Sequence, residues 1–274
     1  MSRSVLSALL FTLGTCVAHA SVVNTAQVFV SPNFSGGNGP FDQTTNNAGA
    51  VDIVSPTVTG PSGSVGHGAA FVDYGVIKMS GDSAGSLNSS GRAIIRDELT
   101  FFSPTLATGT LVHVTYQVAV DGTLSVGPLG NSNVRWTLQT DMGGGAFDMQ
   151  KGGELFGDSP SLARHGYFGD AFGTFSATAT VQLGFVQQLT IELFGVAQTG
   201  FDGVGSSPSA FDLGHSLYWA GIEALTFNGQ TVSDFGVTSG SGTAYGQSLA
   251  PVPLPGSLLM LAPALALGLL RRRG

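Results

Sequence analysis

Short runs of alternating apolar and polar residues, separated by turn-forming residues, dominate the chain between residues 26 and 238. The clearest run is LVHVTYQVAV at 111–120, in which successive side chains fall on opposite faces of a strand. The predicted core face carries Val112, Val114, Tyr116, Val118 and Val120. The predicted outward face carries Leu111, His113, Thr115, Gln117 and Ala119.

The same pattern predicts further strands at 26–30, 51–54, 69–79, 92–102, 134–140, 173–182, 188–196, 218–227 and 233–238. We expect 69–79 to pair with 92–102 and 173–182 to pair with 188–196. Asp121-Gly122 and Asn228-Gly229 are typical of tight turns. Frequent Gly, Asn and Ser turns without a long helical period predict an all-β fold. The predicted domain is one two-sheet β-sandwich, jelly-roll-like, over residues 21–238.

The first 20 residues have the pattern of a signal peptide. Arg3 provides the positive start, residues 5–13 are apolar, and Ala18 and Ala20 form a small-x-small cleavage site. Cleavage after Ala20 would leave Ser21 as the mature N-terminus. The alternative is a lipoprotein cleaved before Cys16, although Thr15 stands where a small residue is usual at such sites.

The C-terminal end has three parts after a Gly/Ser-rich linker predicted at 239–251. The first is a stiff motif, Val252, Pro253, Leu254, Pro255 and Gly256, whose prolines fix φ and lack an amide proton. An apolar run at 254–270 follows, and as a helix it would span roughly 25 Å, short for a membrane core. Arg271, Arg272 and Arg273 close the segment, typical of a cytoplasmic membrane stop. The alternative is a buried amphipathic helix, but no polar face supports it.

The order and position of these parts resemble the PEP-CTERM sorting signal in its VPLPA-CTERM variant, with Gly256 where alanine is usual. The resemblance implies an exosortase-type protease as partner, which recognises the proline motif and processes the protein. It also implies export, transient anchoring in the inner membrane through the C-terminal helix, and delivery to the cell surface or extracellular space. Residues 97–125 and 211–245 loosely resemble exterior domains of such proteins, and these patterns imply no activity.

Charge and cysteine content argue against nucleic-acid binding and thiol chemistry. The predicted exterior part holds all 17 acidic residues but only six basic ones, which gives a net charge of −11. No basic stripe exists for a phosphate backbone, so we expect no nucleic-acid partner. The only cysteine, Cys16, lies in the predicted signal peptide, so we expect neither a disulfide nor thiol chemistry in the mature protein.

The sequence contains no recognisable catalytic or metal-binding motif. The mature histidines, His67, His113, His165 and His215, lack zinc-type spacing, and all but His113 are predicted in loops. No Gly-x-Ser-x-Gly elbow or phosphate-binding loop lies between a strand and a helix. We therefore expect no enzymatic activity, no metal and no cofactor.

Carboxylates leave two alternatives open. Glycoside hydrolysis needs a carboxylate pair, but the candidates are too scattered to pair by sequence: Asp97, Glu98, Glu154, Asp158, Glu192 and Glu223. Calcium could use hard oxygens in the turns at 81–83, 157–159 and 201–203, although none has the spacing of a dedicated calcium site.

Aromatic residues cluster between 147 and 175 among glycines and charged residues. They are Phe147, Phe156, Tyr167, Phe168, Phe172 and Phe175. Such a segment could stack on a sugar ring; the interpretation we favour is that these rings plug the end of the sandwich.

Two hypotheses follow from the sequence. The preferred one is an exported surface or extracellular-matrix protein associated with exopolysaccharide or biofilm, without catalysis of its own. The alternative is an exported carbohydrate-active enzyme or carbohydrate-binding module on the same β-sandwich scaffold.

Overall fold

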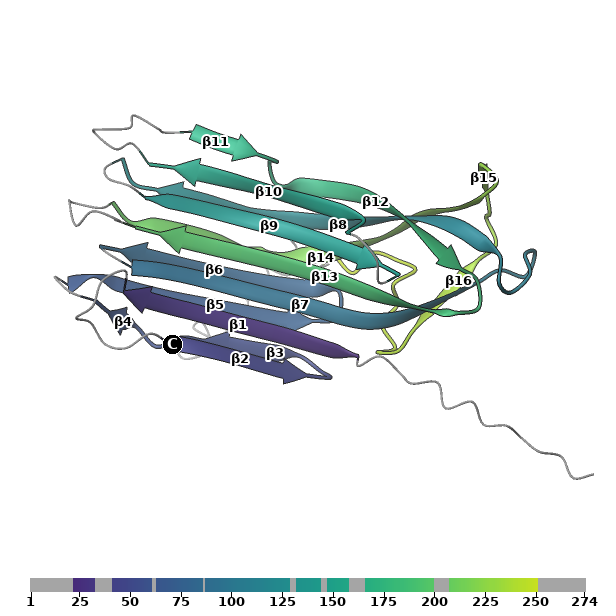
Figure 1. Ribbon diagram of the computed structural model, residues 1–274, viewed down its shortest axis with the longest axis horizontal. Helices are drawn as coiled ribbons and strands as arrows, with labels where there is room; N and C mark the ends of the chain where they lie inside the picture. The colour runs from purple at the N-terminus through teal and green to yellow at the C-terminus, as the bar shows by residue number, and fades with distance from the viewer. Residues whose placement is uncertain are drawn as a thin grey trace, which may run out of the picture.

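A computed structural model describes residues 22–32, 41–60, 63–85, 87–128, 132–143, 147–157, 166–199 and 207–250. These residues form two antiparallel β-sheets with almost no helix, which confirms the predicted all-β class (Figure 1). The predicted signal peptide, sorting motif, apolar span and arginine cluster lie outside the described residues. Within the described ranges, no helix has the length and apolar character required to cross a membrane.

The first sheet, called sheet A, follows the strand order β11-β10-β9-β13-β7-β1-β2, with β16 also paired to β7. Its strands are β11 (Gly166–Gly169), β10 (Met149–Phe156), β9 (Asn133–Met142), β13 (Val186–Gln198), β7 (Leu87–Phe102), β1 (Val23–Pro32), β2 (Phe41–Asn47) and β16 (Gly236–Ser239). The long central strands β7 and β13 pair along 13 residues, so this part of the sheet is continuous and regular.

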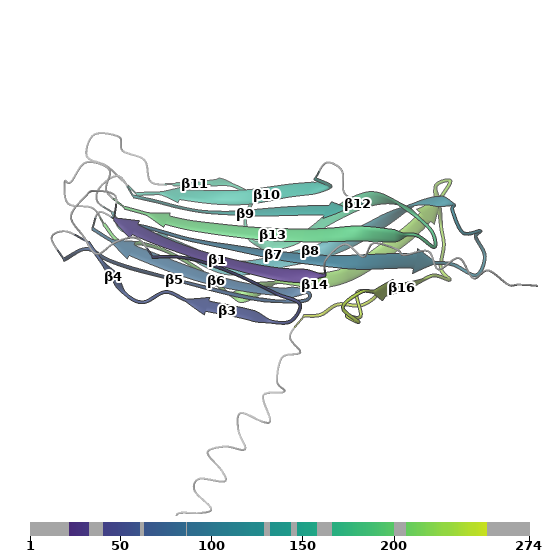
Figure 2. The ribbon, with the colours of Figure 1, turned by 60° about the horizontal axis from the view of Figure 1, so that its bottom comes forward.

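The second sheet, sheet B, follows the order β12-β8-β14-β6-β5-β3, with β15 paired to β14 and β4 paired to β5. Its strands are β12 (Gly173–Gln182), β8 (Leu111–Val126), β14 (Ser209–Phe227), β6 (Val76–Ala84), β5 (Val65–Asp73), β3 (Val51–Val54), β15 (Gln230–Thr231) and β4 (Val58–Thr59). The two sheets form the two layers of a sandwich (Figure 2).

The core lies between the sheets and follows the predicted alternation. The inward residues of β8 are buried, from Val112 to Val120, and His113 and Leu111 are exposed as expected, but Ala119, predicted on the outward face, is only 4% exposed. The Phe211 ring packs directly against two glycines on neighbouring strands, where any side chain would clash with it. A Cβ atom would lie 2.4 Å from its ring at Gly81 of β6 and 2.6 Å at Gly195 of β13.

Several predicted strand pairings were wrong. Residues 69–79 do not form one strand: β5 and β6 make a hairpin there, and β7 pairs with β1 and β13 instead. The strands at 173–182 and 188–196 exist but lie in different sheets. Asp121-Gly122 is not a turn, because β8 continues through it to Val126. The Asn228-Gly229 turn is confirmed, with both residues at positive φ between β14 and β15.

Residues 239–250, predicted as part of a linker, pack against the sandwich. Ser241 donates hydrogen bonds from its backbone N and its Oγ to the Asp97 carboxylate, which is 1% exposed. Tyr245 is fully buried, and the backbone N of Leu249 donates to the carbonyl of Trp219 at 2.8 Å. The packed part of the chain therefore reaches Ala250, close to the predicted sorting motif.

Candidate functional site

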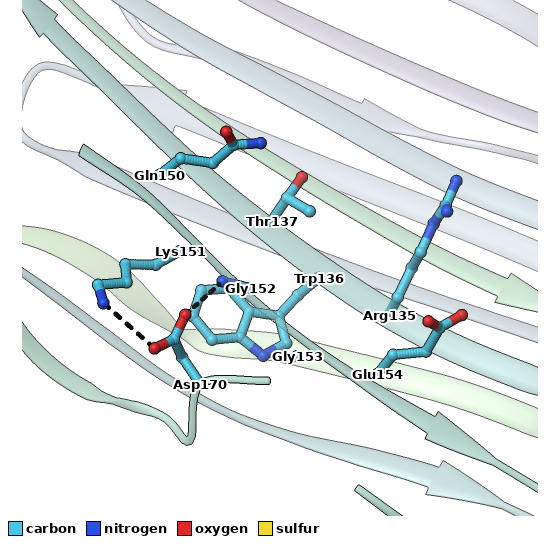
Figure 3. A pocket seen from close by; sticks show the side chains of 9 residues that line it. All are labelled: Arg135, Trp136, Thr137, Gln150, Lys151, Gly152, Gly153, Glu154 and Asp170. Atoms are coloured by element: carbon cyan, nitrogen blue, oxygen red, sulfur yellow. Dashed lines mark hydrogen bonds and ion pairs between the residues drawn. The ribbon is translucent and has the colours of Figure 1, made fainter. Parts of the chain in front are cut away.

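The best-defined hollow in the described residues is a shallow depression of about 320 Å³ at the β9–β10 end of sheet A (Figure 3). It is lined by Arg135, Trp136, Thr137, Gln150, Lys151, Gly152, Gly153, Glu154 and Asp170. The alternating burial of β9 directs Arg135 and Thr137 to the outer face of the sheet and Trp136 to the core. The depression therefore opens on the solvent side of sheet A.

Gly152 shapes the floor of the depression. A Cβ atom at this position would lie 2.7 Å from the carbonyl oxygen of Trp136, so no larger residue fits without a shift of the backbone. Asp170, just after β11, holds the edge in place: its Oδ2 accepts from the Gly152 backbone N at 3.1 Å. Its Oδ1 accepts from Lys151 Nζ at 3.2 Å (Figure 3). These contacts fix β10 to the turn that follows β11.

Next to the depression, Arg135, Thr137, Phe194 and Arg92 lie on the outer face of sheet A, and we call this surface the platform. The strand register places Phe194 of β13 beside Thr137 of β9 and Arg92 of β7. The Arg135 guanidinium lies over the Phe194 ring, with its Cζ 5.9 Å from the ring centroid. Arg92 donates to both oxygens of Glu192 at 2.8 and 2.9 Å, and this hydrogen bonding raises the pKa of Arg92.

The outer face of sheet A carries most of the described basic side chains, together with the carboxylates of Asp141, Glu154 and Glu192. Of the five basic side chains in the described residues, Arg92, Arg96 and Arg135 lie on the outer face of sheet A. Arg92 is engaged with Glu192, whereas Arg135 forms no ion pair within the described residues. Within the part of the chain that the structure describes, Arg135 therefore has guanidinium N–H groups that a bound molecule can use.

Together, these groups can recognise a polyhydroxylated surface. Glu154 and Asp170 offer carboxylate oxygens that accept from hydroxyl groups, while Arg135 and Gln150 offer donors. The Phe194 ring adds an apolar surface on β13, next to Arg135 and Thr137 of β9. A regular sheet presents such groups at the fixed spacing of neighbouring strands, about 4.8 Å apart.

The predicted histidine candidates are not brought together. His67 lies in β5, not in a loop as predicted, and its Nδ1 contacts Asp82 Oδ1. His113 bonds to Thr180 at 3.1 Å on the outer face of sheet B. His215 falls within β14, which also corrects the loop prediction, and His165 lies outside the described residues. The described chain contains no group of three or more His, Cys, Asp or Glu residues suited to a metal ion.

Of the three turns considered for calcium, the structure describes one in full. Residues 81–83 belong to β6, where Asp82 pairs with His67, so they do not form a turn. Residues 158–159 and 201–203 lie outside the described ranges.

The aromatic cluster divides between core and surface. Phe172 stacks on the buried Trp136 at 5.2 Å between centroids, and Phe175 lies 6.0 Å from the same ring. Phe147 is 56% exposed. Phe172 and Phe175 therefore pack against the core as the favoured interpretation expected, whereas the exposed Phe147 contradicts it.

The candidate carboxylates are dispersed. Asp97 is engaged with Ser241, Glu192 with Arg92, and Glu223 accepts from Gln117 at 3.2 Å on sheet B. Glu154 lines the depression, where Asn133 donates to it at 3.2 Å. Asp158 lies outside the described residues. Of the predicted carboxylates that the structure describes, only Glu154 borders the depression.

Sequence reasoning missed Arg135, Thr137 and Phe194, the residues that form the platform. The run RWTLQT at 135–140 carries the signal, because its alternation places Arg135 and Thr137 on one face. Phe194 could not be placed beside them, because sequence does not show that β13 lies between β9 and β7. No protein-family model, curated protein or solved structure matches this chain.

Proposed function

We propose that this protein is an exported, non-catalytic β-sandwich of jelly-roll type that binds neutral polysaccharide outside the cell through the outer face of sheet A. The observation that carries the proposal is the Arg135 guanidinium, which lies over Phe194, lines the Gly152 depression and forms no ion pair with any described residue. Donors, carboxylate acceptors and an aromatic surface meet there on one rigid face.

The charge of the domain selects the class of polysaccharide. A predicted net charge of −11 repels polyanions at low salt. Neutral sugars avoid this repulsion, and their hydroxyls can both donate to Glu154 and accept from Arg135. We therefore expect binding to neutral glucans or mannans and weaker binding to a polyuronate such as alginate.

The test measures binding of residues 22–250 to immobilised glucan, mannan and alginate. Arg135→Gln should weaken binding to the neutral polymer at least about tenfold, because a charged donor is lost. Lys78→Gln is the matched control, since Lys78 is exposed on the opposite sheet and the charge change is equal. Equal effects of the two substitutions, or no binding by the unmodified protein, would contradict the proposal.

The same protein and the same polymers distinguish the binding proposal from the alternative, a carbohydrate-active enzyme. Glu154 and Asp170 both line the depression, so hydrolysis should be assayed on the polymers that bind. Release of reducing ends that disappears in Glu154→Gln would replace the binding proposal with a catalytic one.

Export and sorting form the second part of the proposal, supported by the terminal segments of the sequence. The signal peptide ending at Ala20 would send the domain out, and the motif at 252–256 would direct processing by an exosortase-type protease. Replacing Pro253 and Pro255 with alanine should leave full-length protein in the membrane fraction. Normal processing of that double variant would refute the sorting role of the motif.

A further inference from the structure

Strand β12 forms one edge of sheet B, and β8 is its only hydrogen-bonding neighbour among the described strands. Figure 2 shows it on the same side of the sandwich as β10 and β11. The strand is ten residues long, GTFSATATVQ, and contains neither a charge nor a proline. Long, uncharged edge strands are templates for pairing with another chain.

The register shows which backbone groups of β12 are available. Leu183 N donates to Thr110 O, and β12 and β8 keep one register from Gly173 to Gln182. Because backbone bonding alternates along an antiparallel strand, the odd-numbered residues of β12 bond to β8. The residues whose N–H and C=O groups point away from the sheet are therefore Thr174, Ser176, Thr178 and Thr180.

The other described sheet edges carry features that discourage pairing. β11 has four residues, and β3 has four residues with Asp52 among them and Pro56 just after it. β2 is longer but carries the charged residue Asp42. Short length, charge and proline are the usual protections of sheet edges. β12 has none of them.

The sequence of β12 is also complementary to itself. An antiparallel pair of identical strands lies on a two-fold axis, so the same surface serves both copies. With even-numbered residues opposite even-numbered residues, Thr and Ser hydroxyls meet across the axis, which favours cross-strand pairing. β12 itself carries no charge, and the Glu223 carboxylate of β14, which accepts from Ser176 Oγ at 3.4 Å, is bound within its own sheet.

We propose that β12 pairs with β12 of a second copy of this chain, joining two sheets B into one continuous sheet. Gly143, in the turn after β9, lies beside the Thr180 carbonyl, since a Cβ there would be 3.9 Å from that oxygen. This turn crowds the Thr180 end of the strand, so the proposed pairing is centred on its other half. The two-fold axis therefore passes close to Ser176. The resulting dimer carries two platforms on sheet A, so a shared polysaccharide would be held by both.

The test uses residues 22–250 without polysaccharide, because every described strand and the whole described core lie within this part. Sedimentation velocity should show a dimer that dissociates on dilution. Thr178→Lys should abolish the dimer by placing two charges at the edge. Thr115→Lys is the matched control, since Thr115 bonds to Thr178 at 3.1 Å but lies on β8, away from the edge. A protein that stays monomeric, or equal dimers from both variants, would overturn the proposal.

Single cysteines distinguish this interface from any other. Residues 22–250 contain no cysteine, and opposite residues in a hydrogen-bonded antiparallel pair have Cα atoms about 5.5 Å apart, within disulfide range. Ser176→Cys should give a covalent dimer under mild oxidation, and Thr115→Cys should not. Thr178→Pro tests the same edge without charge, because proline removes an amide that points outward. A dimer that survives Thr178→Pro and does not cross-link at position 176 would assign association to another surface.

Discussion

The indole Nε1 of Trp219 donates a 2.7 Å hydrogen bond to the backbone carbonyl of Tyr245, and the two rings meet edge to face at 5.2 Å. Tyr116 stacks on Trp219, with an angle of 9° between the rings. The segment at 239–250 is therefore part of the core and not a tether, because its aromatic residue completes a stack that begins in β8.

Removing this segment should destabilise the domain. Residues 22–238, which end where the sequence predicts the domain to end, should unfold at a lower urea concentration than residues 22–250. In the longer protein, Tyr245→Ala should cost about 3 kcal/mol or more of unfolding free energy, as for other buried aromatic residues. Tyr218→Ala, at a partly exposed position of β14, should cost less. Equal stability of the two lengths would show that 239–250 contributes nothing.

Asp148 should make stability depend on pH. Burial raises the pKa of its carboxyl above 3.8, while its Oδ2 accepts from Met142 N at 2.7 Å and from the Tyr116 hydroxyl at 3.0 Å. A raised pKa in the folded protein means that the carboxyl's contribution is complete below about pH 3.8 and is lost as pH rises through the folded-state pKa.

Asp148→Asn removes this loss, and one amide oxygen can still accept both hydrogen bonds. The unfolding free energy of the variant relative to the unmodified protein should therefore increase between pH 3 and pH 8. Urea titrations across that range measure it. A constant difference would show that Asp148 does not titrate with folding.

Gly195 should tolerate no side chain. A methyl group there would lie 2.6 Å from the Phe211 ring, so Gly195→Ala should cost about 1–3 kcal/mol through overpacking. Gly173→Ala is the control, because nothing lies within 4 Å of its added Cβ and the residue also sits in a strand. Thermal or urea unfolding compares them. Similar midpoints would mean that the Phe211 site relaxes freely.

Gly229 separates backbone strain from lack of space. An added Cβ would meet nothing within 4 Å, but the residue has a φ of 78° in the β14–β15 turn. Gly229→Ala should therefore cost about 1 kcal/mol, the penalty of a left-handed conformation for an L-residue. Gly173→Ala, with equal room and no positive φ, should cost less. Unchanged stability of Gly229→Ala would show that the turn relaxes.

Local pattern determined the strands whose faces differ most in polarity. β12 and the first ten residues of β8 appear where the alternation predicts them. A strand with one buried face needs apolar residues at every second position, and this pattern is visible in the sequence itself. The Asn228-Gly229 turn was equally predictable, since its chemistry is local. Aromatic residues 172 and 175 were correctly expected to plug the sandwich.

Long-range pairing was decided by the tertiary structure. The sequence of β7 does not show that it lies between β1 and β13, because many partners satisfy the same alternation. For the same reason Phe194 could not be placed under Arg135, although each residue was visible on its own strand. Residues 239–250 look like a linker by composition, and only the packing against Trp219 explains why Tyr245 is buried. The sequence thus specifies which strand faces are apolar and therefore buried. The pairing of distant strands decides which side chains become neighbours on the solvent-facing sides of the sheets.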